Sequence, residues 1–346
     1  MRRGLIARSP AELPDTTLDA RLARVRTAMA RDNLDALIVY TNNTRPAGVS
    51  WLTGFVPYWS EALLVVPRQG EPVLVVALTF RVKTWIERTS RVADVIHTPR
   101  VGLEAGRRIA TQKPDAAVGV VDLDGLPAGI ADDLAEAGPQ LIVTDASTLF
   151  AQARARADAA EIVLATKAAT IARDALMQIA RDDTELGPML AAAEASARIA
   201  GAEEIYLAVA PDLAHDTRLR RIEGDATRGT RFAVRASVAY KATWVRLTRT
   251  IGCGAAARDA ALGQFATAVK GLPGERGFAG FPSWLVEGCR LAQPLEPLAG
   301  SGIAPADLAP GMLVSAQARI AVAGEPVLIG APTLVGGAPL VDPLCD

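Results

Sequence analysis

The sequence predicts two domains: a three-layer α/β domain with a mixed sheet, followed by a domain of helices and antiparallel strands. The chain has 346 residues, half of them hydrophobic, which is enough for two cores of ordinary size. Up to about residue 150, strand-like and helix-like segments alternate, as they do in layered α/β proteins. After Gly201 the pattern changes to longer strands with alternating side chains, which is typical of antiparallel hairpins.

An amphipathic helix begins the first domain, because apolar residues recur every three or four positions from Leu18 to Met29. A buried strand at 36–40 follows. Apolar runs at 62–66 and 72–76 flank a connection that contains Gly70, so we expect an antiparallel hairpin there. The remaining segments expected in this domain are helices near 79–89, 102–111 and 125–137 and strands at 92–96, 118–121 and 141–143.

The second domain starts with a helical stretch, 154–200, for which Asp158 is a plausible N-cap. Polar and helix-breaking residues near Asp182 and Pro188 divide this stretch into two helices. We place the domain boundary after residue 152, giving domains 1–152 and 153–346. Beyond it we expect strands at 205–210, 231–240 and 243–251, a helix at 255–269, and short strands at 284–286, 312–318 and 327–335.

Composition excludes several classes of function. With 37 basic and 38 acidic residues the net charge is −1, so no basic surface predicts a nucleic-acid partner. No run of about 18 apolar residues predicts a membrane span, and the first residues lack the apolar stretch of a signal peptide. Cysteine is scarce, with three residues at unrelated spacings. We therefore expect a reduced, cytoplasmic protein without a nucleic-acid or membrane partner.

Histidine gives the sharpest constraint, because the whole chain contains only His97 and His215. Imidazole is the commonest ligand of catalytic zinc and the commonest general base near neutral pH. Any function that needs a cluster of histidines is therefore excluded.

Five sequence motifs in a fixed order resemble one family. They are RLARVRTAMARDNLDALIVY with WLTGF, EALLVVPRQGEPVLVV, ADAAEIVLATKAATIARDAL, RASVAYKATWVRLTRTIGCG and LAPGMLVSAQARI. This order resembles the creatinase/prolidase/aminopeptidase P family of M24-type, metallopeptidase-like proteins. The resemblance implies an α/β N-terminal creatinase-like domain, an α+β pita-bread C-terminal domain and a homodimer.

The metal ligands that the resemblance implies are missing from this chain. Metallopeptidases of the family hold two divalent ions with two aspartates, one histidine and two glutamates. The motifs place Arg235 and Arg246 at the aspartate positions, Glu287 at or near the histidine, and Gln317 and Gly330 at the glutamates. Two guanidinium groups repel a dication. We therefore expect neither a metal cofactor nor the family's dinuclear chemistry.

A second departure from the family concerns length. The stretch between Lys270 and Glu287 has room for little beyond a loop. The pita-bread domain is therefore expected to be shorter by about one helix.

Two classes of function follow. In the first, the protein acts on a small anionic, amino-acid-derived substrate by metal-independent acid/base chemistry: C–N hydrolysis, elimination or cyclisation. The residues expected to carry it are His215 and Glu287 as catalytic groups and Arg235, Arg246, Gln317 and Tyr240 as substrate-binding groups. In the second, the protein is an inactive pseudo-peptidase that binds a ligand or a protein partner.

Each site residue also has a plainer interpretation. His215 is more often an ordinary loop histidine than a base. The two arginines are as readily explained by ion pairs with Glu287 or Glu223 that fill a vacated metal site. An open cavity lined by these residues favours chemistry, whereas guanidinium groups buried in ion pairs oppose it.

Overall fold

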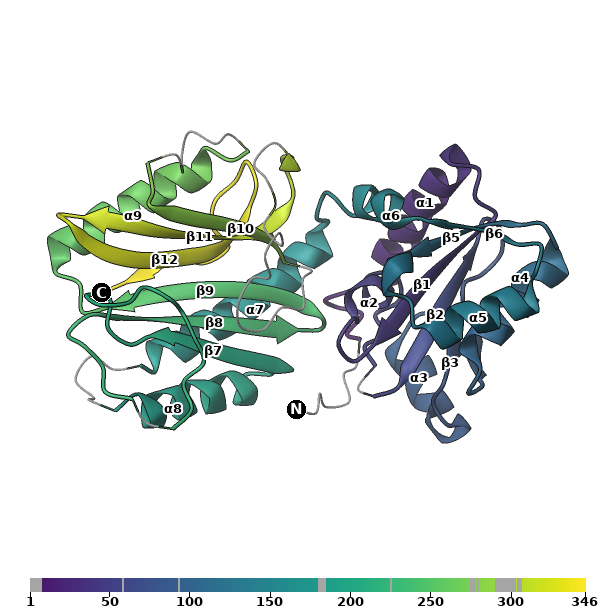
Figure 1. Cartoon of the computed structure of the whole chain (residues 1–346), viewed down its shortest axis with the longest axis horizontal. Coiled ribbons are helices and arrows are strands. Elements are labelled where there is room, and N and C mark those ends of the chain that lie inside the picture. Colours follow the sequence, from purple (N-terminus) through teal and green to yellow (C-terminus); the bar gives the residue numbers. More distant parts are fainter. Residues whose placement is uncertain are drawn as a thin grey trace. The chain divides into compact units, whose positions relative to one another are not determined.

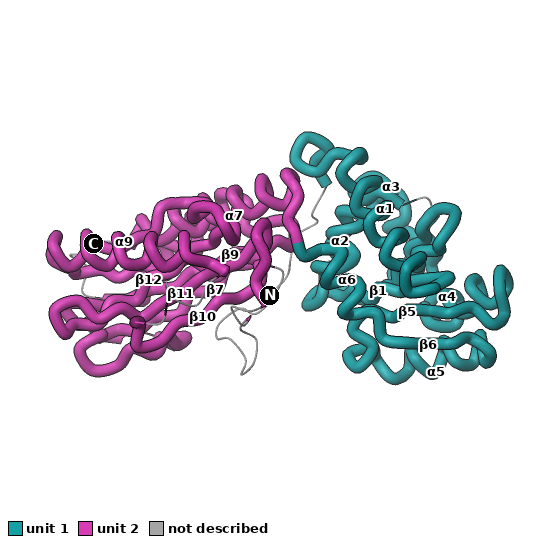
Figure 2. Tube along the Cα trace, turned by 90° about the horizontal axis from the view of Figure 1, so that it is seen from above, with its two compact units in different colours: residues 1–155 teal, residues 156–346 magenta. Residues whose placement is uncertain are grey.

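The computed structural model describes residues 8–57, 59–92, 94–179, 185–224, 226–273, 278, 280–289, 303 and 307–346. The chain divides into two compact units, residues 1–155 and 156–346, which Figure 2 colours separately. No helix in the described residues is long and apolar enough to cross a membrane.

The first unit is built on a six-stranded mixed sheet in the order β4-β3-β2-β1-β5-β6. Strands β1, β2 and β3 are antiparallel neighbours, whereas β3–β4, β1–β5 and β5–β6 pair in parallel. Its strands are β1 (Ala36–Asn42), β2 (Glu61–Pro67), β3 (Val73–Val76), β4 (Asp94–His97), β5 (Ala117–Val121) and β6 (Ile142–Asp145). The predicted hairpin and mixed sheet are confirmed.

Helices cover both faces of this sheet because its strand residues alternate between two apolar clusters. Leu37 and Val39 contribute to one cluster, with residues of α1, α2, α3 and α6, and Ala36 and Ile38 to the other, with residues of α4 and α5. The helices are α1 (Asp15–Arg31), α2 (Ala47–Thr53), α3 (Lys83–Thr89), α4 (Val101–Gln112), α5 (Ala128–Ala137) and α6 (Ser147–Ala153).

The second unit has a seven-stranded sheet in the order β10-β11-β12-β9-β8-β7, with β13 pairing alongside β9. Its helices are α7 (Ala159–Met177), α8 (Leu186–Ile199) and α9 (Ala255–Lys270). Its strands are β7 (Glu204–Ala210), β8 (Phe232–Tyr240), β9 (Thr243–Ile251), β10 (Ser283–Gly288), β11 (Leu313–Val322), β12 (Glu325–Leu334) and β13 (Leu344–Cys345). Figure 1 shows α7, α8 and α9 on one side of this sheet.

The period-two alternation of strand residues gives this sheet two different faces. Val234, Ala236 and Val238 of β8 point into the main apolar core, which residues of α7, α8 and α9 complete. Arg235 and Ser237 between them are buried polar residues on the opposite face. That second face, turned away from the helices, positions the candidate site.

The expected shortening of the pita-bread domain agrees with the described residues. Two helices, α7 and α8, precede the strand β7, whereas α9 is the one described helix between β9 and β10. The mixed α/β sheet domain followed by this second sheet domain confirms the fold class.

Candidate functional site

The five residues that the sequence motifs place at metal-ligand positions meet at one place on the polar face of the second sheet. One residue from each of β8, β9, β12 and β11 lies in a single row across the sheet. In this row Arg235 pairs with Thr248, Thr248 with Gly330, and Gly330 with Gln317. Arg246 lies two residues before Thr248 on β9, so both side chains share a face. Glu287 joins the same group, because its Oε2 contacts both Arg246 Nε and the Gln317 amide nitrogen.

A buried ion pair occupies one end of the site. Arg246 Nε lies 3.4 Å from Glu287 Oε2, and the two side chains are 1% and 0% exposed. The backbone N–H of Arg246 donates to the Ser315 hydroxyl at 3.0 Å, which holds β9 against β11. Burial lowers the pKa of the Arg246 guanidinium, and the Glu287 charge opposes that effect. Since a guanidinium stays protonated in proteins, Arg246 remains a cation.

Gln317 connects this ion pair to the second arginine. Its amide nitrogen donates to Glu287 Oε2 at 3.1 Å. Its amide oxygen accepts from Arg235 Nη1 at 3.2 Å and from the Thr248 hydroxyl at 3.4 Å. An amide has both a donor and an acceptor, so glutamine can bridge an acid and a base where a glutamate could not.

Gly330 makes room for this bridge. A Cβ atom at position 330 would lie 2.9 Å from Gln317 Cγ, 3.0 Å from the Ala316 carbonyl oxygen and 3.2 Å from the Thr248 hydroxyl. A larger residue would therefore push the Gln317 and Thr248 side chains apart. The glycine at 330 is therefore part of the same packing arrangement as the glutamine at 317.

An open cavity of about 200 Å³ lies beside Arg235 on the same face. Arg319 lines it together with Arg235, and its Nη1 donates to the Thr217 hydroxyl at 3.2 Å. Sequence reasoning missed Arg319, although it follows Gln317 by two residues on β11 and therefore shares its face. The other lining residues are Leu219, Thr248, Ser283, Trp284, Leu285, Gln317, Ala318, Leu328 and Ile329.

Two of the sequence-predicted residues lie apart from this network. The His215 side chain is 83% exposed, and its Nδ1 is 2.7 Å from Asp212 Oδ2, which lowers the pKa of that carboxyl through the hydrogen bond to His215. The structure therefore does not bring His215 together with the fully buried Glu287. Tyr240 packs against the helix-side core, where its ring meets Lys241 Nζ at 5.4 Å, so it faces away from Arg235.

The residues present do not fit the two divalent ions that the fold implies. Among the described residues, no three histidine, cysteine, aspartate or glutamate side chains come together in a group that could hold a metal ion. Glu287 is the one carboxylate in the described network of Arg235, Arg246, Thr248 and Gln317, and Arg246 neutralises it. The site is a pita-bread site rebuilt as a hydrogen-bonded, mainly cationic network.

Comparisons with known proteins agree with this architecture. Residues 21–156 match the creatinase/prolidase N-terminal domain family. The solved structure of prolidase from Pyrococcus furiosus matches with a TM-score of 0.66 and 16% identity, covering 92% of this chain and 97% of that one. Xaa-Pro dipeptidase from Bacillus anthracis matches with a TM-score of 0.67 and 17% identity, covering 92% and 96%. No curated protein matches the sequence.

These findings confirm the resemblance that the sequence motifs predicted. The protein has a creatinase/prolidase N-terminal domain and a prolidase-like fold over nearly its whole length. X-Pro aminopeptidase from Thermotoga maritima shares that fold at 13% identity, with a TM-score of 0.66, over 92% of this chain and 97% of that one.

Proposed function

We propose that this protein binds a small anionic ligand in the cavity beside Arg235 and Arg319, and that it does so without the two-metal chemistry for which its fold is suited. One observation carries the proposal: the lining of that cavity has two guanidinium groups and no carboxylate, imidazole or thiol among its described residues. Such a lining attracts an anion and supplies no group of its own for acid/base chemistry near neutral pH.

The charge balance favours the anion because the third arginine is already neutralised. Arg246 forms an ion pair with Glu287, and neither residue lines the cavity. Arg235 Nη1 donates to the Gln317 amide oxygen, and Arg319 Nη1 donates to the Thr217 hydroxyl, so both guanidinium groups are held at the cavity lining. Two guanidinium groups can each hold a carboxylate or a phosphate through charge-assisted hydrogen bonds.

The apolar part of the cavity narrows the ligand class. Leu219 and Leu285 line the cavity, and Leu285 lies opposite Gln317 in the sheet, so it shares the face of the two arginines. A ligand that fits both parts carries a carboxylate and a modest apolar group. This combination is typical of a small amino-acid derivative, and a ligand of that kind buries its side chain while the arginines hold its carboxylate.

Binding explains the site better than catalysis. His215 is held by Asp212 on the surface. Glu287 is fully buried, does not line the cavity, and shares its Oε2 between Arg246 and Gln317. Neither proposed catalytic group is therefore in a position to take a proton from a ligand in the cavity, since general-base catalysis requires hydrogen-bond reach. We favour the pseudo-peptidase over the metal-independent hydrolase for this reason.

Calorimetric titration with N-acetyl-L-leucine and its neutral amide tests the proposal. We expect saturable binding of the acid and much weaker binding of the amide. Arg235→Gln and Arg319→Gln should each weaken acid binding about tenfold or more, since a hydrogen bond to a charged group contributes about 1.5–3 kcal/mol. Arg258→Gln, which removes an exposed charge paired with Asp259 on α9, is the matched control and should change nothing.

Two outcomes would contradict the proposal. One is equal binding of the acid and the amide, because the arginines would then not be recognising charge. The other is hydrolysis of an Xaa-Pro dipeptide by the purified wild-type protein supplied with manganese, which would show that the rebuilt site still supports peptidase chemistry.

A further inference from the structure

A second cavity lies in the first unit, which contributes no residue to the proposed function. It has a volume of about 270 Å³ and is formed by α1, the end of α2, β2 and the segments that lead into β3 and out of α3. Its floor is aliphatic, consisting of Leu18, Leu22, Leu52, Leu64, Val66 and Val92. A cavity with an apolar floor and a few polar groups at its rim is the usual form of a small-molecule site.

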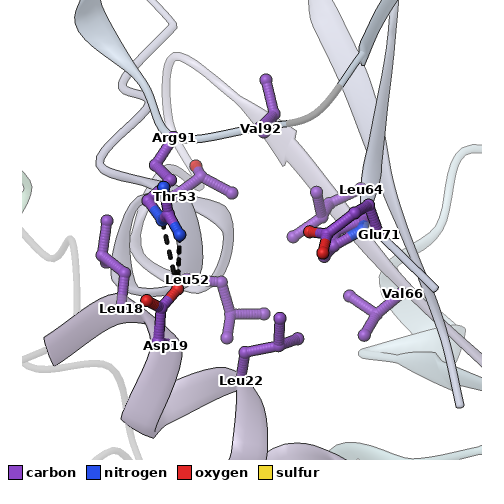
Figure 3. A pocket seen from close by; sticks show the side chains of 11 residues that line it. Leu18, Asp19, Leu22, Leu52, Thr53, Leu64, Val66, Glu71, Arg91 and Val92 are labelled. Atoms are coloured by element: carbon purple, nitrogen blue, oxygen red, sulfur yellow. Dashed lines mark hydrogen bonds and ion pairs between the residues drawn. The ribbon is translucent and has the colours of Figure 1, made fainter. Parts of the chain in front are cut away.

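The rim carries more negative than positive charge. Figure 3 shows Asp19 and Arg91 on one side of the cavity and Glu71 on the other. Arg91 is already engaged, because its Nη2 lies 2.8 Å from Asp19 Oδ1 and its Nη1 lies 3.4 Å from Asp15 Oδ2. The described lining residues therefore include two carboxylates, Asp19 and Glu71, and one guanidinium, Arg91. The Arg91 guanidinium points toward the acidic side chains of α1.

Neighbouring arginines do not reverse this balance. Arg8 pairs with Asp15, outside the lining. Arg26 donates to the backbone carbonyls of Pro67 and Gly70, at the turn that precedes Glu71, and it does not line the cavity. Among the residues that the structure describes, the charged side chains in the cavity lining are Asp19, Glu71 and Arg91.

We propose that this cavity binds a small primary amine that carries an apolar group. The apolar group packs on the leucine and valine floor, and the ammonium lies at the rim beside the Glu71 carboxylate. Most of the affinity comes from apolar burial, because the half-buried lining residues Leu22 and Val92 still have apolar surface that a ligand can cover. The charge contributes selectivity for an amine over a carboxylate, and only modestly, because Glu71 is exposed to solvent.

Titration of the full-length protein with three probes of one shape tests the proposal: 2-phenylethylamine, 2-phenylethanol and 3-phenylpropanoate, followed by NMR. We expect the amine to bind with the lowest Kd, the alcohol more weakly, and the acid at least tenfold more weakly than the amine. Glu71→Gln should raise the Kd of the amine about three- to fivefold and leave the alcohol unchanged. Glu104→Gln changes a half-buried α4 glutamate that pairs with Arg108, and as the matched control it should change neither Kd.

A second variant tests where the probe lies. Leu22→Trp adds bulk to a half-buried lining position, so it should abolish binding of both the amine and the alcohol while circular dichroism confirms the fold. Arg235→Gln and Arg319→Gln should leave amine binding intact, which separates this cavity from the anion cavity. The proposal is overturned if the acid binds as tightly as the amine, if none of the probes binds saturably, or if amine binding responds to the Arg235 and Arg319 variants and not to Glu71→Gln.

Discussion

Arg246 and Glu287 form an ion pair that water does not reach, with Nε and Oε2 3.4 Å apart and almost no exposed surface on either side chain. The two residues come from β9 and β10, which are not neighbours in the sheet. Moving two charges out of water is costly, and their mutual attraction offsets that cost only when both partners are present. The pair is therefore a strong structural constraint on the rebuilt site.

Removing one partner of this pair should destabilise the protein more than removing both. Glu287→Gln removes the carboxylate that faces a buried cation, which should lower the free energy of unfolding by about 3–5 kcal/mol. Arg246→Met with Glu287→Leu removes both charges and should cost less than the single change. Urea denaturation followed by circular dichroism measures both values. The single variants Arg246→Met and Glu287→Leu complete the cycle. If the loss of stability in the double variant equals the sum of the two single losses, the charges are not coupled.

Position 330 should not tolerate a side chain. Gly330→Ala places a methyl group 2.9 Å from Gln317 Cγ and 3.0 Å from a backbone oxygen, so we expect a loss of about 1–3 kcal/mol. The loss should shrink in a Gln317→Ala background, because the strongest side-chain clash is then gone. Thermal unfolding of the four proteins of this cycle measures the coupling. Gly263→Ala is the control, since its Cβ atom would meet nothing within 4 Å in the helix α9.

The fold was largely predictable because its elements carry local signals. The N-cap at Asp158 is an example: the structure shows its Oδ1 accepting from the Glu161 N–H at 3.0 Å, as the sequence predicted. The helix α2 was missed, since Ala47–Thr53 contains a glycine and two β-branched residues that disfavour helices. Its Trp51 and Leu52 are buried in the core, and that tertiary packing overrides the weak propensity.

The site was predictable in its location and only partly in its contacts. The structure brings Arg235, Arg246 and Glu287 into one region. The sequence could not decide which cation pairs with Glu287, because that depends on side-chain geometry between distant strands. The alternation of strand residues between the two faces of the sheet also indicates which residues can join the site. Tyr240 lies five residues from Arg235 on one strand and must face the other side, whereas Arg319 follows Gln317 by two and shares its face.

Divalent metal should not stabilise this protein. Because Arg246 occupies the ligand region and neutralises Glu287, adding manganese or cobalt ions in millimolar amounts should leave the Tm unchanged. Magnesium at the same concentration controls for ionic strength. Elemental analysis after dialysis measures the bound metal independently. About two tightly bound metal ions per chain would overturn the assignment of the ligand positions.

Arg249 should be a stronger structural residue than its surface partner Asp346. Its Nη1 donates to the Leu176 carbonyl and, at 3.1 Å, to the Ile179 carbonyl at the end of α7, while its Nε donates to Asp346 Oδ1 at 2.6 Å. Arg249→Met removes the guanidinium hydrogen bonds to both carbonyls, and we expect a loss of about 2–4 kcal/mol. Asp346→Asn keeps the donor in place and should cost about 1 kcal/mol or less, because Asp346 is partly exposed. Equal losses in urea denaturation would contradict this ranking.

The stabilising contact of Asp35 should depend on pH in a defined direction. Hydrogen bonds from Lys113 Nζ at 2.8 Å and from the Ala117 N–H at 2.9 Å lower the pKa of Asp35, with the lysine as the largest cause. An acid whose pKa is lower in the folded state stabilises the protein above its unfolded pKa of about 3.9, and this contribution disappears as pH falls through the lower folded value. Asp35→Asn should therefore lower the free energy of unfolding by about 1 kcal/mol or less at pH 7, after allowance for solvent screening. The difference from wild type should narrow steadily below pH 4. Urea denaturation between pH 2 and pH 7 measures it, and a difference that grows on acidification would show that the sign is wrong.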